Sequence, residues 1–214
     1  MGNQLRQLWS DNKGYFLAAG LLLLGGATIG FFQADMVETL AKQMLAQIKE
    51  IVDRIKENGG SVAATFWAIF KNNVISSLMM MALGVFFAVF PIVGLLSNGV
   101  LLGFIMAKIS AAGVNPLLVF AVGILPHGIF ELPAVVFASA VGIRLGMLSF
   151  RSIGALLRIN RAELVKNEWH AALKQFPAAV LTVVVLLFIA AFVESVVTPL
   201  LLQNTVGGQF QLFK

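Results

Sequence analysis

Residues 73–107 read NVISSLMMMALGVFFAVFPIVGLLSNGVLLGFIMA and contain no charged side chain. One helix needs about 20 apolar residues to cross the hydrocarbon core of a bilayer, so this stretch is too long for a single span. It is interrupted by Pro91, whose ring disfavours a continuous helix. We therefore predict two membrane-spanning helices, at residues 73–91 and 95–112, joined by a tight turn that begins near Pro91.

The whole chain shares this apolar character. Of its 214 residues, 59% are hydrophobic and 12% are charged, and the mean hydropathy is +0.91. Soluble domains carry about 25% charged residues, so the composition excludes an ordinary soluble protein. Three more apolar runs, at 14–32, 116–142 and 175–197, are each long enough to cross a bilayer. We predict an all-α fold: an integral membrane helical bundle of about five transmembrane helices, in one membrane domain covering residues 1–214.

The predicted span at 14–32 contains two glycines four residues apart, Gly26 and Gly30. Residues at this spacing lie on the same face of a helix. Two small residues on one face let the backbone of a second helix come close. We expect a close helix contact at this face.

Two connecting segments have amphipathic patterns. In residues 33–58, apolar side chains recur every three or four positions, which predicts a helix with one apolar face. In residues 144–174, basic side chains alternate with apolar ones, which is typical of a segment lying along the membrane interface. We predict an outer amphipathic helix at 33–58 and a basic amphipathic segment at 144–174.

The charges of these segments predict the orientation of the chain. Residues 144–174 carry six basic and two acidic side chains, a net charge of +4 (6 − 2), whereas residues 33–71 carry five of each. Because short basic loops stay in the cytoplasm, we predict that 144–174 and the N-terminus are cytoplasmic in the plasma membrane. The helix at 33–58 then lies outside. A re-entrant hairpin at 116–142 would reverse the later loop, and the charge asymmetry argues against it.

Ionisable side chains interrupt the predicted fourth span, where residues 125–133 read LPHGIFELP. Pro126 and Pro133 lack a backbone donor, so we predict a broken helix at this point. His127 and Glu131 are four residues apart and share one helix face. A charged side chain at the bilayer centre costs about 2.5 to 3.5 kcal/mol, so both are expected to face the interior of the bundle.

Other polar residues lie in the neighbouring spans. We predict that Glu194 of the fifth span and Asn98 of the third join His127 and Glu131 in one intramembrane polar cluster. The cluster either satisfies hydrogen bonds inside the bundle or forms a route for ions or protons. Arg144 is expected at the inner end of the fourth helix, where a cation complements the last carbonyls.

The sequence contains no recognisable catalytic motif. It has no cysteine, no HExxH pair and no GxSxG elbow. We therefore predict a protein that is not an enzyme, with no cofactor and no metal site, and keep a metal-dependent hydrolase as a minor alternative. The net charge of +5 is assigned to contact with anionic lipid headgroups, and no nucleic-acid partner is expected.

Four segments follow one another in an order that resembles the stage II sporulation protein M family. They are NNVISSLMMMALG, SNGVLLG, LPHGIFELPAVVFASAVGIRLG and VESVVTP, between about residues 72 and 199. The resemblance implies a multi-pass membrane protein that positions peptidoglycan-degrading partners during engulfment in endospore formation, without cleaving peptidoglycan itself. His127, Glu131, Arg144 and Glu194 match polar positions of the family, and the resemblance assigns them no catalytic role.

These inferences lead to one expected function and one alternative. We expect a non-enzymatic scaffold whose outer helix meets its partners, which are the bilayer, other membrane or peptidoglycan-remodelling proteins, or a second copy of the chain. The alternative is a small transporter or channel component that uses the His/Glu cluster.

Overall fold

The computed structural model describes residues 2–57, 59–156 and 161–201, without the side chains of residues 2–7 and 156. These residues form helices joined by short turns and include no strand. In chain order the helices are α1 (Gly2–Phe32), α2 (Ala34–Glu57), α3 (Val62–Leu83), α4 (Val89–Ala111), α5 (Pro116–Val119), the π-helix η1 (Phe120–Ile124), α6 (Leu125–Leu156), α7 (Ala162–Phe192) and the π-helix η3 (Val193–Val197). The all-α prediction is confirmed.

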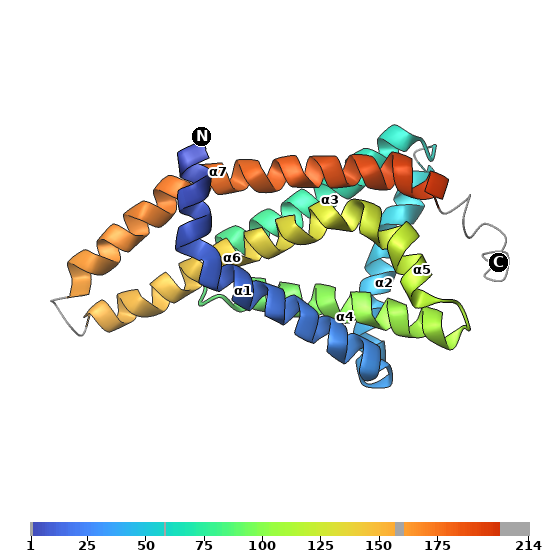
Figure 1. Ribbon diagram of the computed structural model, residues 1–214, viewed down its shortest axis with the longest axis horizontal. Coiled ribbons are helices and arrows are strands. Elements are labelled where there is room, and N and C mark those ends of the chain that lie inside the picture. The colour runs from blue at the N-terminus through green and yellow to red at the C-terminus, as the bar shows by residue number, and fades with distance from the viewer. Residues whose placement is uncertain (1, 58, 157–160, 202–214) are drawn as a thin grey trace.

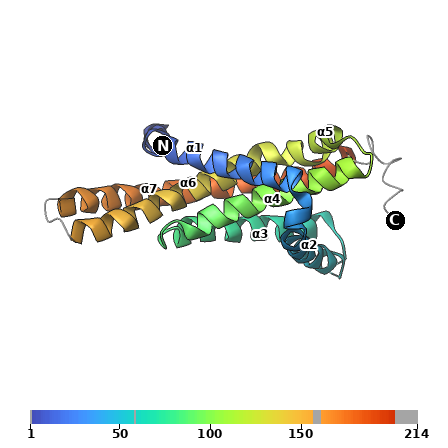
Figure 2. The same ribbon diagram turned by 90° about the horizontal axis from the view of Figure 1, so that it is seen from below.

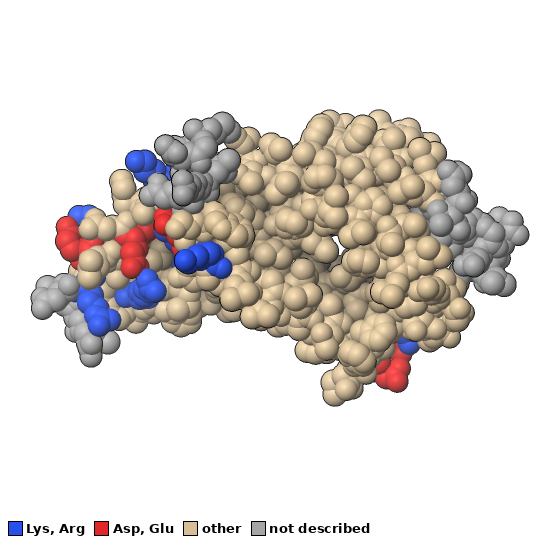
Figure 3. Space-filling model, in the orientation of Figure 1, with Lys and Arg blue, Asp and Glu red and all other residues tan. Residues whose placement is uncertain are grey.

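Among the described residues, five helical segments are long and apolar enough to cross a membrane. They are Leu8–Phe32, Val62–Leu83, Val89–Ala111, Pro116–Ala155 and Ala162–Leu201. They run in a bundle with α6 and α7 side by side (Figure 1; Figure 2). The face in Figure 3 carries charged side chains mainly at the α6–α7 end, and the surface between the two ends is uncharged. This uncharged surface is what a protein exposes to lipid.

Glycines bring α1 and α4 into close contact. A Cβ added at Gly30 would collide with the Val100 carbonyl of α4, and one added at Gly103 would collide with the Ala27 carbonyl of α1. Gly26 faces the backbone of α4 in the same way. The predicted close contact at Gly26 and Gly30 is therefore present, and α4 contributes glycines of its own to it.

The turn between the second and third spans lies earlier than predicted. α3 ends at Leu83 and α4 begins at Val89, so Pro91 lies inside the first turn of α4. A proline is accepted there because the first N–H groups of a helix have no partner within it. The sequence predicts that Pro91 ends a helix, but in the structure it lies two residues after the start of α4. Residues Phe87 and Ala88 of the turn adopt left-handed backbone angles, with φ of 55° and 61°.

The fourth span bends without a gap in its helical backbone. α5, η1 and α6 follow one another directly, and Pro133 lies inside α6. The N–H of Leu125 donates to the carbonyl of Phe120, five residues back, so the turn before Pro126 stays closed. α5 leaves the line of α6 at a steep angle in Figure 1. The predicted break at Pro126 and Pro133 is thus a bend through the π-helical turn that precedes them.

The basic segment at 144–174 is a helical hairpin, which corrects the prediction that it lies along the membrane interface. α6 continues to Leu156, and α7 starts at Ala162 (Figure 1). Arg151 forms an ion pair with Glu168 at 2.9 Å across the two arms. Trp169 Nε1 donates to Ser152 Oγ at 2.9 Å. The polar side chains pair with each other between antiparallel helices, so the segment packs as a hairpin.

The helix predicted at 33–58 is present, in a slightly shorter range. α2 starts two residues after the end of α1 and crosses the other helices at one end of the bundle (Figure 1). Its Ala41 is fully buried. Glu38 forms ion pairs with Lys42 at 2.6 Å and with Lys108 of α4 at 3.5 Å. Burial of Ala41 and the pair with Lys108 fix α2 against the bundle.

Candidate functional site

The structure brings His127, Glu131 and Glu194 together. His127 and Glu131 lie one turn apart near the start of α6, and Glu194 lies in η3 at the end of the fifth span. One ligand atom from each residue lies within 4.8 Å of the other two. His127 Nε2 lies 3.9 Å from Glu131 Oε2. The sequence assigns the first two residues to one helix face, and only the fold shows that Glu194 meets them.

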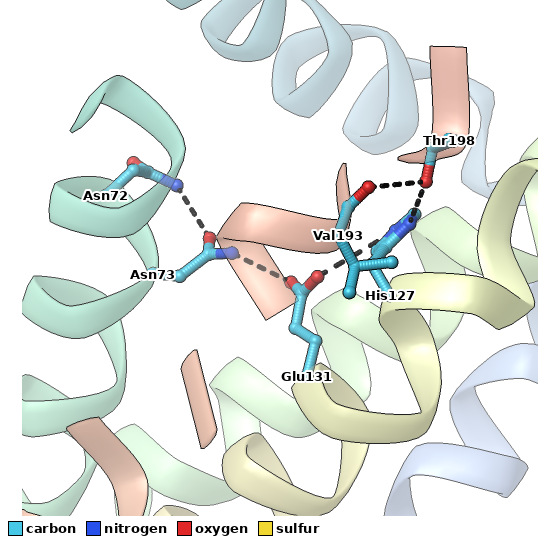
Figure 4. A network of polar contacts seen from close by, with 6 residues as sticks. All are labelled: Asn72, Asn73, His127, Glu131, Val193 and Thr198. Atoms are coloured by element: carbon cyan, nitrogen blue, oxygen red, sulfur yellow. Dashed lines mark hydrogen bonds and ion pairs between the residues drawn. The ribbon is translucent and has the colours of Figure 1, made fainter. Parts of the chain in front are cut away.

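Asparagines of α3 complete one side of this group (Figure 4). Asn73 Nδ2 donates to Glu131 Oε1 at 3.1 Å. Asn72 Nδ2 donates in turn to Asn73 Oδ1 at 3.3 Å. The cluster predicted from the sequence did not include Asn73. The sequence shows only that an amide side chain stands at the start of the uncharged run 73–107. It does not indicate which neighbouring helix this side chain contacts.

Asn98 does not join the group. Its side chain is exposed and its Nδ2 donates to the carbonyl of Gly94 in the same helix, at 3.0 Å. An amide that bonds its own backbone one turn earlier needs no partner from another helix. The cluster predicted from the sequence therefore consists of His127, Glu131 and Glu194, with Asn73 in place of Asn98.

A threonine orients the imidazole from the other side. His127 Nδ1 lies 3.4 Å from Thr198 Oγ1. The Thr198 hydroxyl donates to the Val193 carbonyl at 3.4 Å, within the last turn of η3 (Figure 4). Because a hydroxyl has one hydrogen, its oxygen is left to accept from Nδ1–H of the imidazole. This tautomer leaves Nε2 as an acceptor that faces Glu131.

The group lies inside the bundle, near the midpoint of α3 and toward the end of the fifth span. Asn73 is close to the midpoint of α3, a helix of 22 residues. Such a helix is about 33 Å long, close to the thickness of the hydrocarbon core. The side chains of His127 and Glu131 are 13% and 26% exposed, so the bundle covers most of both. A cluster at this depth is shielded from bulk water and holds polar groups that lipid cannot satisfy.

Arg144 belongs to a second polar network. It lies well inside α6, which continues to Leu156, so the prediction that it caps the inner helix end is wrong. Its Nη1 donates to Gln175 Oε1 at 2.7 Å and to Asn12 Oδ1 at 3.5 Å. Gln175 Nε2 donates to Asp11 Oδ2 at 2.8 Å. This network joins α1, α6 and α7.

Five apolar spans around inward-facing polar networks define a multi-pass helical membrane protein. The chain belongs to the stage II sporulation protein M family, whose family model matches residues 18–199. That match includes every residue of the His127 cluster and Arg144. An uncharacterized protein of Methanocaldococcus jannaschii is 28% identical over 139 residues, which are 65% of this chain and 74% of that protein. No solved structure matches the chain.

Proposed function

We propose that this protein is a non-enzymatic membrane scaffold that positions peptidoglycan-remodelling proteins during engulfment in sporulation. Membership of the stage II sporulation protein M family supports a role in sporulation. The observation that carries the scaffold role is the outer helix α2, whose apolar stripe is only partly covered by the bundle.

The bundle covers the apolar stripe of α2 incompletely. Ala41 is fully buried, but Met36, Leu40, Ile48 and Val52 are 81%, 45%, 43% and 40% exposed. Apolar residues on an amphipathic helix at the membrane surface need cover from lipid or from another protein. At these four positions the cover must come from outside the described part of the bundle.

The charge of α2 favours a protein as this cover. The helix Ala34–Glu57 has five acidic and four basic residues, a net charge of −1 (4 − 5). Helices that bind anionic lipid surfaces are rich in Lys and Arg. Several of the charges in α2 are paired with each other, such as Arg54 with Glu50. A helix with this charge has little attraction for an anionic lipid surface, and a partner protein fits it better.

Co-purification tests the scaffold role. Tagged protein isolated from membranes of the native cells is expected to bring peptidoglycan-cleaving activity with it. The double variant Ile48→Gln and Val52→Gln is expected to lose most of that activity, because both substitutions place a polar group on the exposed stripe. Lys49→Gln, an exposed change away from the stripe, is the matched control. Equal recovery of activity with the double variant and the control would reject the proposal.

The alternative function, a transporter or channel component, draws on the His127 cluster. The cluster lies inside the bundle and contains polar groups from three helical segments. Reconstituted protein that moves ions or protons, and whose flux is lost in Glu131→Gln and in His127→Ala, would favour this alternative. If intact, folded protein moves no ion or proton, the transporter or channel alternative is rejected.

A further inference from the structure

Two acceptors face each other inside the membrane at His127 and Glu131. Thr198 receives the Nδ1 hydrogen of the imidazole, so Nε2 presents a lone pair. Asn73 donates to Oε1 of Glu131, which leaves Oε2 directed toward Nε2 at 3.9 Å. Two lone pairs directed at one another repel unless a positively charged group lies between them.

Glu194 adds a second carboxylate to the same spot. Its ligand atom lies within 4.8 Å of those of His127 and Glu131. Among the residues that the structure describes, no hydrogen bond or salt bridge involves the Glu194 carboxylate. Its polar atoms are therefore available to a ligand.

The net charge of His127, Glu131 and Glu194 has no counter-charge among their neighbours in the described residues. If both carboxylates are ionised and the imidazole is neutral, the three groups carry a charge of −2, in a region where isolated charges are expensive. No lysine or arginine of the described residues pairs with any of the three. One divalent cation neutralises the group.

We propose that His127, Glu131 and Glu194 bind one divalent first-row transition-metal cation of the Zn²⁺ type, which joins α6 to η3 inside the helical bundle. This inference goes beyond the scaffold function and does not depend on it. It also departs from the sequence-based expectation of no metal site, because that expectation rested on motifs within one segment and these ligands come from two.

The ligand types suit such an ion. Zn²⁺ takes imidazole nitrogen and carboxylate oxygen, whereas purely oxygen sites favour Mg²⁺ or Ca²⁺. Bonds of about 2.0 to 2.2 Å place tetrahedral ligands about 3.3 Å apart. The present separations of up to 4.8 Å need to shorten by about 1.5 Å, which rotation of the two flexible glutamate side chains can supply.

The surroundings supply a supporting shell for a metal site. Metal-bound histidines donate their second ring N–H to an oxygen, and metal-bound carboxylates accept hydrogen bonds from outside the site. Thr198 and Asn73 occupy these two roles, and Asn72 orients Asn73 in turn. Glu194 lies in a π-helical turn and His127 follows another, and such turns are frequent at functional sites.

Metal binding to the whole chain tests the proposal. Purified protein in detergent, stripped with a chelator, is titrated with Zn²⁺ and analysed for bound metal after dialysis. We expect one ion per chain. Glu131→Gln and Glu194→Gln are each expected to weaken binding at least about 100-fold, because each removes a direct ligand. Glu163→Gln removes a highly exposed carboxylate from the α6–α7 hairpin and is expected to bind as the unchanged protein does.

Two further variants keep the test decisive if a ligand variant fails to fold. Asn73→Ala and Thr198→Val leave all three ligands in place and are expected to weaken Zn²⁺ binding about 10- to 100-fold. Co²⁺ bound to the unchanged protein reports its ligands through its visible absorption, and His127→Ala is expected to change that spectrum.

Three results would overturn the proposal. The unchanged protein binds no stoichiometric metal, which means that a shared proton compensates the cluster. Binding survives both Glu131→Gln and Glu194→Gln. Binding is lost in His170→Ala, a substitution of the exposed histidine of α7, which would place the ion on the hairpin instead.

Discussion

Asn73 of α3 donates a hydrogen bond of 3.1 Å to Glu131 of α6, between residues 58 positions apart in the chain. Lipid offers no competing donor or acceptor at this depth, so a broken contact leaves both groups to find other partners within the protein. The bond therefore specifies how α3 and α6 face each other.

The first prediction concerns this bond. Asn73→Ala removes the donor from a largely covered carboxylate and is expected to lower the free energy of unfolding by roughly 1 to 2 kcal/mol. Unfolding in detergent, followed by helical circular dichroism, measures the change. A double-mutant cycle with Glu131→Leu, which removes the acceptor, isolates the pair, and a coupling energy of zero would show that the two side chains do not interact.

The second prediction concerns the glycine contact between α1 and α4. Gly30→Ala places a Cβ against the Val100 carbonyl of α4, so the helices must separate, with an expected loss of roughly 1 to 3 kcal/mol. Gly25→Ala is the matched control on the same helix, because no atom lies within 4 Å of a Cβ added there. The control is expected to be neutral or to stabilise α1 slightly. Equal effects of the two variants in thermal unfolding would contradict this contact.

The third prediction concerns pH and the seating of α2. The hydrogen bond from Lys42 and the nearby charge of Lys108 lower the pKa of Glu38 below its usual 4.5. A lowered pKa in the folded protein gives a stabilisation that is present above pH 4.5 and is lost as the pH falls through the folded value. Hydrogen exchange of α2 amides is therefore expected to quicken as the pH falls below about 4.5, beyond the normal pH dependence of exchange.

Glu38→Gln is the control for this pH effect. It removes the titrating group, so the additional change in α2 protection at low pH is expected to disappear. Glu57→Gln alters an acid at the opposite end of the same helix and is expected to keep the effect. A pH response that is the same in Glu38→Gln as in the unchanged protein would assign it to another group.

The fourth prediction concerns orientation in the membrane. The chain has no cysteine, so single cysteines can be labelled without background. A membrane-impermeant thiol reagent applied to intact cells is expected to label Lys49→Cys on α2 and to leave Lys166→Cys on the hairpin unlabelled, because the basic segment stays inside. After permeabilisation both are expected to react. Labelling of Lys166→Cys alone in intact cells would show that the orientation is opposite to the predicted one.

The sequence was sufficient for the class of fold because length and hydropathy alone determine where helices cross a bilayer. The five apolar runs correspond to five spanning segments, and the glycine pair in α1 marks a real helix contact. The boundaries were less predictable. Pro91 lies in the first turn of a helix in this chain, although proline also occurs where helices end. The residue type alone does not distinguish a helix start from a helix end.

The site was partly predictable for a related reason. Spacing places His127 and Glu131 on one face, because that is a property of a single helix. The choice of partners depends on which helices are neighbours and how they are rotated. The Asn98 side chain donates a hydrogen bond within α4, whereas the Asn73 side chain donates one to α6. Arg144 donates hydrogen bonds to α1 and α7 from a position well inside α6. No spacing rule within one segment contains that information.

Photocrosslinking at Met36 of α2 tests the central claim most directly. This side chain is 81% exposed, so a photoreactive residue placed there contacts whatever covers the stripe. In native cells the scaffold account predicts a crosslink to a peptidoglycan-remodelling protein, identified by its mass and its cleaving activity, and no such crosslink from position 49. Adducts with lipid alone at position 36, or the same products from both positions, would contradict it.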